Sequence, residues 1–304
     1  MRYKGLDLNL LVCLDTLLEV HSVTRAAERL NLSQPAISAS LTRLRTFFDD
    51  PLLVAHGKRM LPTPYAMRLR PAIAGVLGDI DALISLSSNF DPLTSNRTFR
   101  LCVSDYLSSV LISPLLPRME SLAPHIKIEL VPLDDDATVE LDRGEIDMLL
   151  TPEAYISDDH PAELLFEEEH VVAGWRENPL FAGEIDAEVF RRAGHVAVEI
   201  GRVNPASFAE SFMRSRGIER SIEVRVSSFT LIPELLVGTG RLAVMHRRLA
   251  EKASHHYPIT YVPLPFAMPR MREMAQYHRA RADDAGLRWL IGTLMEVAAN
   301  YSRN

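Results

Sequence analysis

Cysteine is scarce in this 304-residue chain, and the sequence marks of several protein classes are missing from it. Its two cysteines, Cys13 and Cys102, have neither the CxxC or Cys/His spacing of a zinc site nor the pattern of a disulfide framework. Residues 1–7 hold no apolar signal-peptide core, and no apolar run approaches the roughly 18–20 residues that cross a bilayer. We therefore expect a cytoplasmic protein with reduced thiols and no membrane partner.

Common enzyme motifs are also missing. The sequence contains no G-x-S-x-G, P-loop, H-E-x-x-H or G-x-G-x-x-G pattern. The acidic run 134–136 precedes an expected helix, where carboxylates favour the helix N-terminus more often than they bind a metal. We expect a protein that is not an enzyme, with no catalytic residue, metal or cofactor.

The composition is that of ordinary globular protein, with 47% hydrophobic and 24% charged residues, and the length favours two domains. The net charge is -7, but it is unevenly distributed. Residues 1–62 carry eight Lys or Arg and six Asp or Glu, a net of +2, so the remainder carries -9. This asymmetry is compatible with a small N-terminal domain that binds nucleic acid.

The N-terminal residues predict a helix-turn-helix that reads duplex DNA. Apolar residues recur at three- and four-residue steps over 7–20, and two shorter amphipathic segments follow. Ser22 and Ser33 are suited to cap these helices, and Pro35 is tolerated in the first turn of the last one. On that helix Ile37, Leu41 and Leu44 are expected to face inward. The alternative is a small helical bundle with incidental Ser and Gln.

The outward face of this helix is expected to contact bases and phosphates. Gln34 is suited to pair with adenine and Ser38 with several base edges, while the nearby arginines suit phosphates. Residues 52–62 alternate around Gly57 like a short hairpin, which would form a wing beside the helix. Its basic residues would reach the flanking groove or backbone, or form only a solvated turn. The predicted DNA-binding residues are Ser33, Gln34, Pro35, Ser38, Thr42, Arg43, Arg45, His56, Lys58 and Arg59.

A long helix is predicted from Pro64 to about Ser88. Its apolar stripe comprises Leu69, Ile73, Val76, Leu77, Ile80, Leu83 and Ile84, with heptad-like spacing. A stripe of this length favours self-pairing into a dimer, and packing against the chain's own body is the alternative. The polar, Pro-containing segment 85–96 predicts a domain boundary.

Strands and helices alternate from Arg97 onward, which predicts parallel sheets covered by helices. The blocks before and after about Gly174 are similar in size, so we expect two α/β lobes with a ligand cleft between them. Ligands bind at the carboxyl ends of strands in such sheets, and a small aromatic ligand with a hydroxyl or carboxylate would suit these ends.

The candidate ligand-binding residues are Ser104, Asp105, Thr151, Glu168, His170, Gly201, Arg202, Asn204, Phe229 and Thr230. Most follow an expected strand. Glu168 and His170 are two apart on one expected strand, so they would share a face. The simpler alternatives are helix caps for Ser104, Thr151 and Thr230, and a structural role for the histidine.

The segments Leu6–Leu11, Thr24–Ser38 and Pro62–Pro64 resemble LysR-type transcriptional regulators, in particular the nodulation-regulator branch and its aromatic-catabolism relatives. The resemblance covers essentially the whole chain. It implies an α + α/β fold in three parts: a winged helix-turn-helix (1–63), a linker and dimerisation helix (64–90), and a two-lobed effector domain like the periplasmic binding proteins (91–304). It departs from the family at Ala55, where many members have a basic residue, so that contact would fall to His56 or Lys58.

The resemblance further implies a sequence-specific transcriptional regulator, an activator or a repressor, controlled by a small aromatic inducer in the inter-lobe cleft. Its expected partners are double-stranded promoter DNA, a second or further copies in a homodimer or homotetramer, and RNA polymerase. A thiol-based redox sensor on the same fold is the alternative, although Cys13 and Cys102 are both expected within buried elements. A solute-binding protein without DNA activity would lack the first sixty residues.

Overall fold

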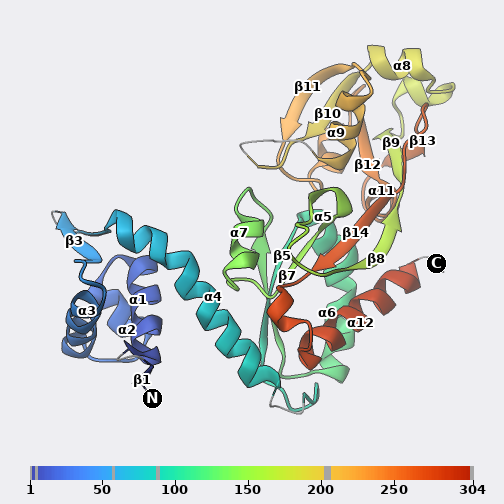
Figure 1. The fold of residues 1–304 in the computed structure, drawn as a ribbon. Helices are drawn as coiled ribbons and strands as arrows, with labels where there is room; N and C mark the ends of the chain where they lie inside the picture. The colour runs from blue at the N-terminus through green and yellow to red at the C-terminus, as the bar shows by residue number, and fades with distance from the viewer. Residues whose placement is uncertain (1, 4–5, 57–58, 87–89, 202–206, 302–304) are drawn as a thin grey trace. The chain divides into compact units, whose positions relative to one another are not determined.

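The computed structural model describes residues 2–3, 6–56, 59–86, 90–201 and 207–301 (Figure 1). The chain divides into two compact units, one of residues Met1–Ser88 with Asp142–Glu145 and the other of Asn89–Leu141 with Ile146–Asn304. Within the described residues no helix has the length and apolar character to span a membrane.

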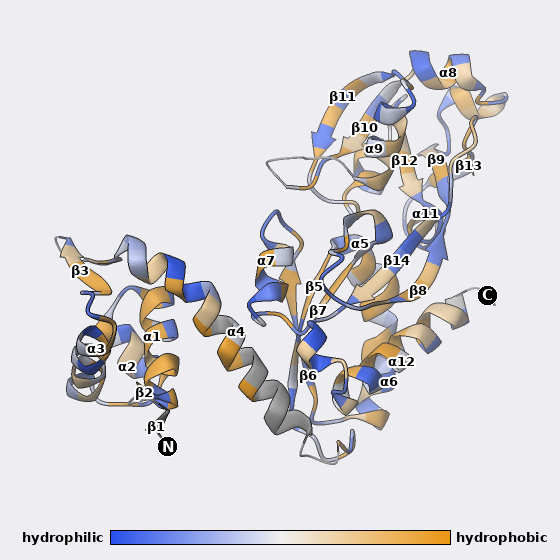
Figure 2. Cartoon of the chain, viewed as in Figure 1, coloured by the Kyte–Doolittle hydropathy of each residue, from blue (hydrophilic) through white to orange (hydrophobic). Residues whose placement is uncertain are grey.

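The first unit contains the predicted helix-turn-helix. Its helices are α1 (Leu8–Val20), α2 (Val23–Arg29) and α3 (Gln34–Phe48), preceded by the short strands β1 (Arg2–Tyr3) and β2 (Leu6–Asp7). The predicted caps are confirmed, since the hydroxyl of Ser22 accepts from the N–H of Arg25 and that of Ser33 accepts from the N–H of Ala36. Figure 2 shows hydrophobic residues along α1 and hydrophilic ones on α3.

The three helices meet in one apolar core. Ile37 and Leu44 of α3 are fully buried and Leu41 is nearly so, as their spacing predicted. They pack against the leucines of α1, among which Leu14 and Leu17 are also fully buried. Burying one such side chain stabilises the fold by about 1.5–3 kcal/mol. The burial of the apolar residues of α3 therefore sets the rotation of this helix and leaves its polar side chains in solvent.

The wing and the long helix follow. Strands β3 (Leu53–His56) and β4 (Arg59–Pro62) form the predicted antiparallel hairpin, and α4 spans Pro64–Leu86. Part of the apolar stripe of α4 packs within its own unit, since Ile73 is buried in the core of α1–α3 and Leu69 and Leu77 pack beside it. Val76 is 43% exposed, and the side chains of Leu83 and Ile84 lie outside the described residues.

The second unit has two five-stranded sheets. The first sheet has the order β6-β5-β7-β14-β8 and defines lobe I. Its strands are β5 (Thr98–Val103), β6 (Lys127–Pro132), β7 (Met148–Pro152), β8 (Ala162–Glu168) and β14 (Met271–Gln276). The helical segments of this lobe are α5 (Asp105–Leu107), a π-helical turn (Ser108–Ile112), α6 (Ser113–Leu122), α7 (Ala137–Asp142) and α12 (Ala285–Tyr301).

The second sheet has the order β11-β10-β12-β9-β13 and defines lobe II. Its strands are β9 (His170–Trp175), β10 (Gly194–Val198), β11 (Ser221–Val226), β12 (Leu242–His246) and β13 (Ile259–Pro263). The helices of this lobe are α8 (Ala187–Arg192), α9 (Phe208–Ser215), α10 (Ile232–Leu236) and α11 (Arg247–Ser254).

Two predictions about this unit are wrong. The sheets are mixed rather than parallel, because β14 runs antiparallel to β7 and β8, and β9 runs antiparallel to β12 and β13. The chain also does not divide once near Gly174. It leaves lobe I after β8 and returns to it with β14, so that α12 lies beside α6 in lobe I (Figure 1). A burial pattern reveals that a segment is a strand, but it does not reveal which sheet the strand joins.

Candidate functional site

The outer face of α3 is polar and open to solvent. Gln34, Ser38, Thr42 and Arg43 are exposed, directly opposite the buried apolar residues of the same helix. Pro35 is exposed in the first turn, and the side chain of Ser33 caps the helix. The Thr42 hydroxyl donates to the carbonyl of Ser38, 3.0 Å away, so its proton is used within the helix.

Arg45 has a structural role that the sequence did not reveal. Its Nε donates to the carbonyl of Pro51 at 2.7 Å and its Nη2 to the carbonyl of Leu53 at 2.6 Å. These bonds tie α3 to the start of the wing and occupy the guanidinium that was expected to contact a phosphate. Arg43 is exposed, and its Nη2 lies 3.9 Å from the Asp7 carboxylate. His56 is exposed at the end of β3, while Lys58 and the side chain of Arg59 lie outside the described residues.

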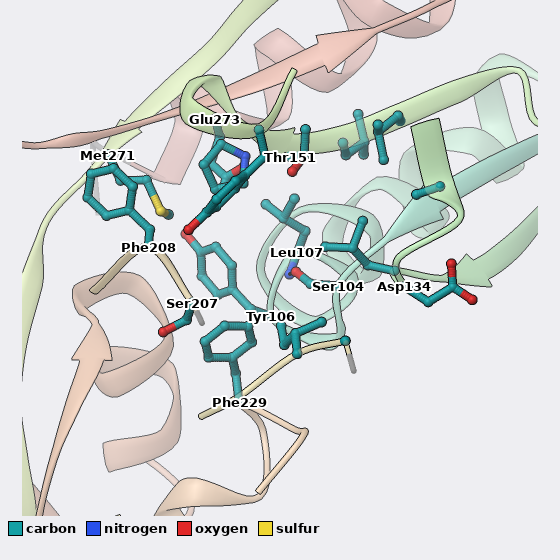
Figure 3. A pocket seen from close by; sticks show the side chains of 18 of the residues that line it. Ser104, Tyr106, Leu107, Asp134, Thr151, Ser207, Phe208, Phe229, Met271 and Glu273 are labelled. Atoms are coloured by element: carbon teal, nitrogen blue, oxygen red, sulfur yellow. Dashed lines mark hydrogen bonds between the residues drawn. The ribbon is translucent and has the colours of Figure 1, made fainter. Parts of the chain in front are cut away.

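The second unit has a cavity of about 190 Å³ between its lobes (Figure 3). Ser104 and Thr151 line it from lobe I, and Gly201 and Phe229 line it from lobe II. These four are predicted ligand-binding residues. Ser104, Gly201 and Phe229 follow strands, and Thr151 lies within β7, one residue before its end. Arg202 and Asn204 lie outside the described residues. The cavity is thus built where two sets of strand ends face each other.

Asp105 and Thr230 do not line this cavity but join its two walls. The Asp105 carboxylate accepts bonds from the Ser228 hydroxyl at 2.7 Å and from the Phe229 N–H at 3.2 Å. It also accepts from the N–H and hydroxyl of Thr230, at 2.8 and 2.7 Å. Because Asp105 begins α5 in lobe I and residues 228–230 belong to lobe II, this carboxylate holds Phe229 at the cavity.

Glu168 and His170 are not on one strand as predicted. Glu168 ends β8 in lobe I, and His170 begins β9 in lobe II. Neither lines the cavity. Glu168 is 2% exposed, and its Oε2 accepts a hydrogen bond from the hydroxyl of Tyr106. The same oxygen lies 3.6 Å from the Nε of Arg248. It therefore supports Tyr106, which does line the cavity.

Phe229 was predicted to line the cavity, whereas the other rings of its wall, Tyr106, Phe208 and His246, were missed from the sequence. Tyr106 stacks on His246 with ring centroids 3.7 Å apart, and Phe229 packs edge-on against both. His170 lies behind them against His246 and Phe208. Burial lowers the pKa of His170 to about 4, and burial with the neighbouring His170 lowers that of His246 well below its usual value. Both imidazoles are neutral at pH 7, so His246 gives the wall an uncharged ring and His170 packs behind it.

Glu273 is the other residue that the sequence did not single out. It lies on β14, is 2% exposed and lines the cavity. Burial, with a smaller contribution from Glu168, raises its pKa to about 8. This carboxyl reaches the cavity because β14 lies between β7 and β8 in the sheet of lobe I, and no local sequence motif marks it.

The two thiols are poorly suited to redox sensing. Cys13 and Cys102 are free and buried, in different units. Burial raises the pKa of the Cys13 thiol and raises that of Cys102 to about 12, whereas a redox sensor needs an accessible thiolate. In the described part of the chain no group of three or more His, Cys, Asp or Glu residues is placed to hold a metal ion.

Family comparisons match both units. The model described as "Bacterial regulatory helix-turn-helix protein, lysR family" matches residues 8–67, and that described as "LysR substrate binding domain" matches residues 94–299. Nodulation protein D 1 of Bradyrhizobium sp. (strain NC92) is 38% identical over 302 residues, which cover 99% of this chain and 96% of the relative. Nodulation protein D 1 of Rhizobium meliloti (strain 1021) is 38% identical, with 98% and 97% covered.

Solved structures share the fold. A probable transcriptional regulator from Pseudomonas aeruginosa superposes with a TM-score of 0.69 at 28% identity, over 96% of this chain and 97% of that one. CbnR, a LysR family transcriptional regulator, superposes with a TM-score of 0.62 at 15% identity, over 98% and 100%. The latter likeness concerns the fold alone.

Proposed function

Since the chain belongs to the LysR family, and is thus a DNA-binding transcriptional regulator with an effector-binding domain rather than an enzyme, we propose that α3 reads its operator and that a small aromatic inducer in the inter-lobe cavity sets its activity. The observation that carries the proposal is the polar outer face of α3 above a fully buried inner face. A helix so presented suits the major groove.

The aromatic nature of the inducer is supported by the cavity wall. Tyr106, Phe208 and Phe229 provide ring faces, and Ser104 and Thr151 provide hydroxyls that can orient a polar substituent. An inducer that binds one arrangement of the lobes more tightly than another would shift the protein toward it. That shift would then alter how the paired DNA-binding units act on the promoter and on RNA polymerase, in the cytoplasm.

Oligomerisation is proposed to use the part of α4 that its own unit does not bury. Val76 is exposed on the stripe that buries Ile73, so the stripe is only partly used within the chain. A homodimer, or a homotetramer built from two, would place two copies of α3 on a partly palindromic site. We propose the domain division 1–63, 64–90 and 91–304 accordingly.

Base reading by α3 is testable with Gln34→Ala and Ser38→Ala in the full chain. An operator is first selected from random duplexes by the unaltered protein. Each substitution is expected to lower affinity for that operator by about 10- to 100-fold, corresponding to about 1–3 kcal/mol per lost base contact. Affinity for random duplex is expected to stay unchanged. Fluorescence anisotropy at two salt concentrations measures both affinities.

Arg43→Ala is the control at an exposed position elsewhere on the same helix. It is expected to weaken binding to operator and random duplex alike, and to reduce the salt slope by about one. If the Gln34 and Ser38 variants kept the full preference for the selected operator, α3 would not be the reading element.

A further inference from the structure

Glu273 has an unusual place among the buried carboxyl groups. Its strand β14 lies between β7 and β8, with Glu273 opposite Pro152 and Phe166. Its side chain lines the inter-lobe cavity, as Figure 3 labels it, and is almost fully buried. Its Oε2 has no hydrogen-bond partner among the described residues. Buried polar atoms are nearly always bonded, so this oxygen has capacity left for a molecule in the cavity.

The charges at the cavity favour an uncharged ligand. The ionisable acids that line it are Asp134, Asp135 and Glu273, and the described lining residues include no Lys or Arg. An aromatic carboxylate would lose its hydration shell there without gaining a cation from the described lining residues. A neutral ligand avoids this cost.

Glu273 is a hydrogen-bond donor at neutral pH. The titratable groups around it are Glu168 from β8, Tyr106 from α5 and His246 from β12, with Arg248 of α11 paired to Glu168. Tyr106 and His246 are uncharged, and Arg248 is directed at Glu168, so none of the described cations holds Glu273 ionised. Its pKa of about 8, raised by burial and then by Glu168, leaves the carboxyl mostly protonated at pH 7. A protonated carboxyl presents one O–H.

The size of the cavity limits the ligand to about one ring. A cavity of about 150 Å³ holds benzene, and this one measures about 190 Å³. The stacked Tyr106 and His246 and the edge of Phe229 suit the faces of that ring. A substituent of about three heavy atoms fills the remaining volume.

We infer that the inducer is an uncharged single-ring aromatic bearing a carbonyl, and that the carboxyl of Glu273 donates a hydrogen bond to that carbonyl oxygen. The inference deepens the proposed effector function and rests on it. It makes Glu273 a specificity-determining residue that admits ketones and excludes aromatic acids of the same size.

The test compares acetophenone with benzoate, two probes of similar size, by calorimetry on the full chain between pH 6.5 and 9.5. Acetophenone is expected to bind, with affinity constant below pH 7 and falling up to tenfold per pH unit above about pH 8, as the donor proton is lost. Benzoate is expected to bind at least tenfold more weakly at pH 7.

Two substitutions at Glu273 separate its roles. Glu273→Gln keeps a donor without titrating, so acetophenone affinity is expected to stay within a few-fold and to lose its pH dependence. Glu273→Ala is expected to weaken acetophenone binding about tenfold at pH 7. Asp134→Asn, which removes an exposed acid from the same lining, is expected to keep the pH dependence of the unaltered protein. Circular dichroism melting verifies that each variant is folded.

The possible failures are distinguishable. Stronger binding of benzoate than of acetophenone, or an unchanged pH dependence in Glu273→Gln, overturns the inference and leaves the effector cavity standing. If neither probe binds at any pH, the inference falls together with the aromatic-effector part of the proposed function, whereas the role of α3 is judged by its own experiment.

Discussion

Asp284→Ala is expected to lower the free energy of unfolding of the second unit by about 3 kcal/mol. Asp284 is 2% exposed, and its Oδ1 accepts from Arg97 Nη1 at 2.6 Å. The same oxygen accepts from the N–H groups of Gly286 and Leu287, both at 3.0 Å, at the start of α12. Removing one partner of a buried ion pair costs about 3–5 kcal/mol, and the lower end applies because Arg97 keeps Asp147 at 3.3 Å.

The same carboxylate predicts a dependence on acid. Burial alone would raise the pKa of Asp284, but the hydrogen bond and charge of Arg97 outweigh it and hold the pKa below its usual value. A depressed pKa contributes stability that is fully present at neutral pH and is lost as the pH falls below about 4, through the folded-state value. The free energy of unfolding of the Asp284→Ala variant is therefore expected to fall less steeply than that of the unaltered protein as the pH is lowered below about 4.

Urea unfolding, followed by the fluorescence of Trp289 in α12, measures this effect. The neighbouring Asp283→Ala is the control, because its side chain is 78% exposed and pairs with the exposed Arg288. That control is expected to change stability by less than about 1 kcal/mol. Equal losses in the two variants would show that the buried pair does not secure α12 to the sheet.

Asp105→Ala is expected to free residues 228–230 from lobe I and to weaken acetophenone binding about 30-fold. The carboxylate accepts four bonds from these residues, and bonds to a charged group contribute about 1.5–3 kcal/mol each when buried. Thr230 is exposed and water replaces part of the loss, so about 2 kcal/mol remains, which corresponds to that factor. Hydrogen exchange at the amides of Phe229 and Thr230 is expected to accelerate by a similar factor.

A matched control is available in lobe II. Asp186 accepts from the N–H groups of Glu188 and Val189 at the start of α8 and does not line the cavity. Asp186→Ala is expected to cost about 1 kcal/mol of stability while leaving acetophenone affinity and exchange at Thr230 unchanged. Unchanged exchange at Thr230 in Asp105→Ala would mean that the bonds of Asp105 do not hold the lobes together.

Local features of the structure could be predicted from the sequence. The caps at Ser22 and Ser33 and the inward face of α3 follow from side-chain chemistry within a few residues. The strands of the second unit could also be expected locally, because an apolar run marks buried strands such as β7 and β9 and alternation marks strands such as β11. The polar residues at or just beyond strand ends, such as Thr151 and Ser104, were found for the same reason.

Features that depend on the path of the chain could not be predicted. Glu273 faces Ser104 and Thr151 only because the chain crosses back into lobe I more than one hundred residues later. The single residue Glu169 separates Glu168 from His170 and turns one expected strand into two, each in its own lobe. The apolar stripe of α4 left two partners open, a second copy or the chain's own body, and only the structure shows that Ile73 packs on its own unit.

The chain passes between the lobes twice, after β8 and before β14, and these two connections lie side by side. Glu168 and Met271 are register partners on β8 and β14, and the ion pair between Glu169 and Arg270 joins the next residues at 2.6 Å. Lobe II is thus an insertion into lobe I, and the two ends of the inserted segment lie next to each other. A short turn joining these ends would leave lobe I as an unbroken sheet, and a different insert would graft a new sensor onto the same DNA-binding protein.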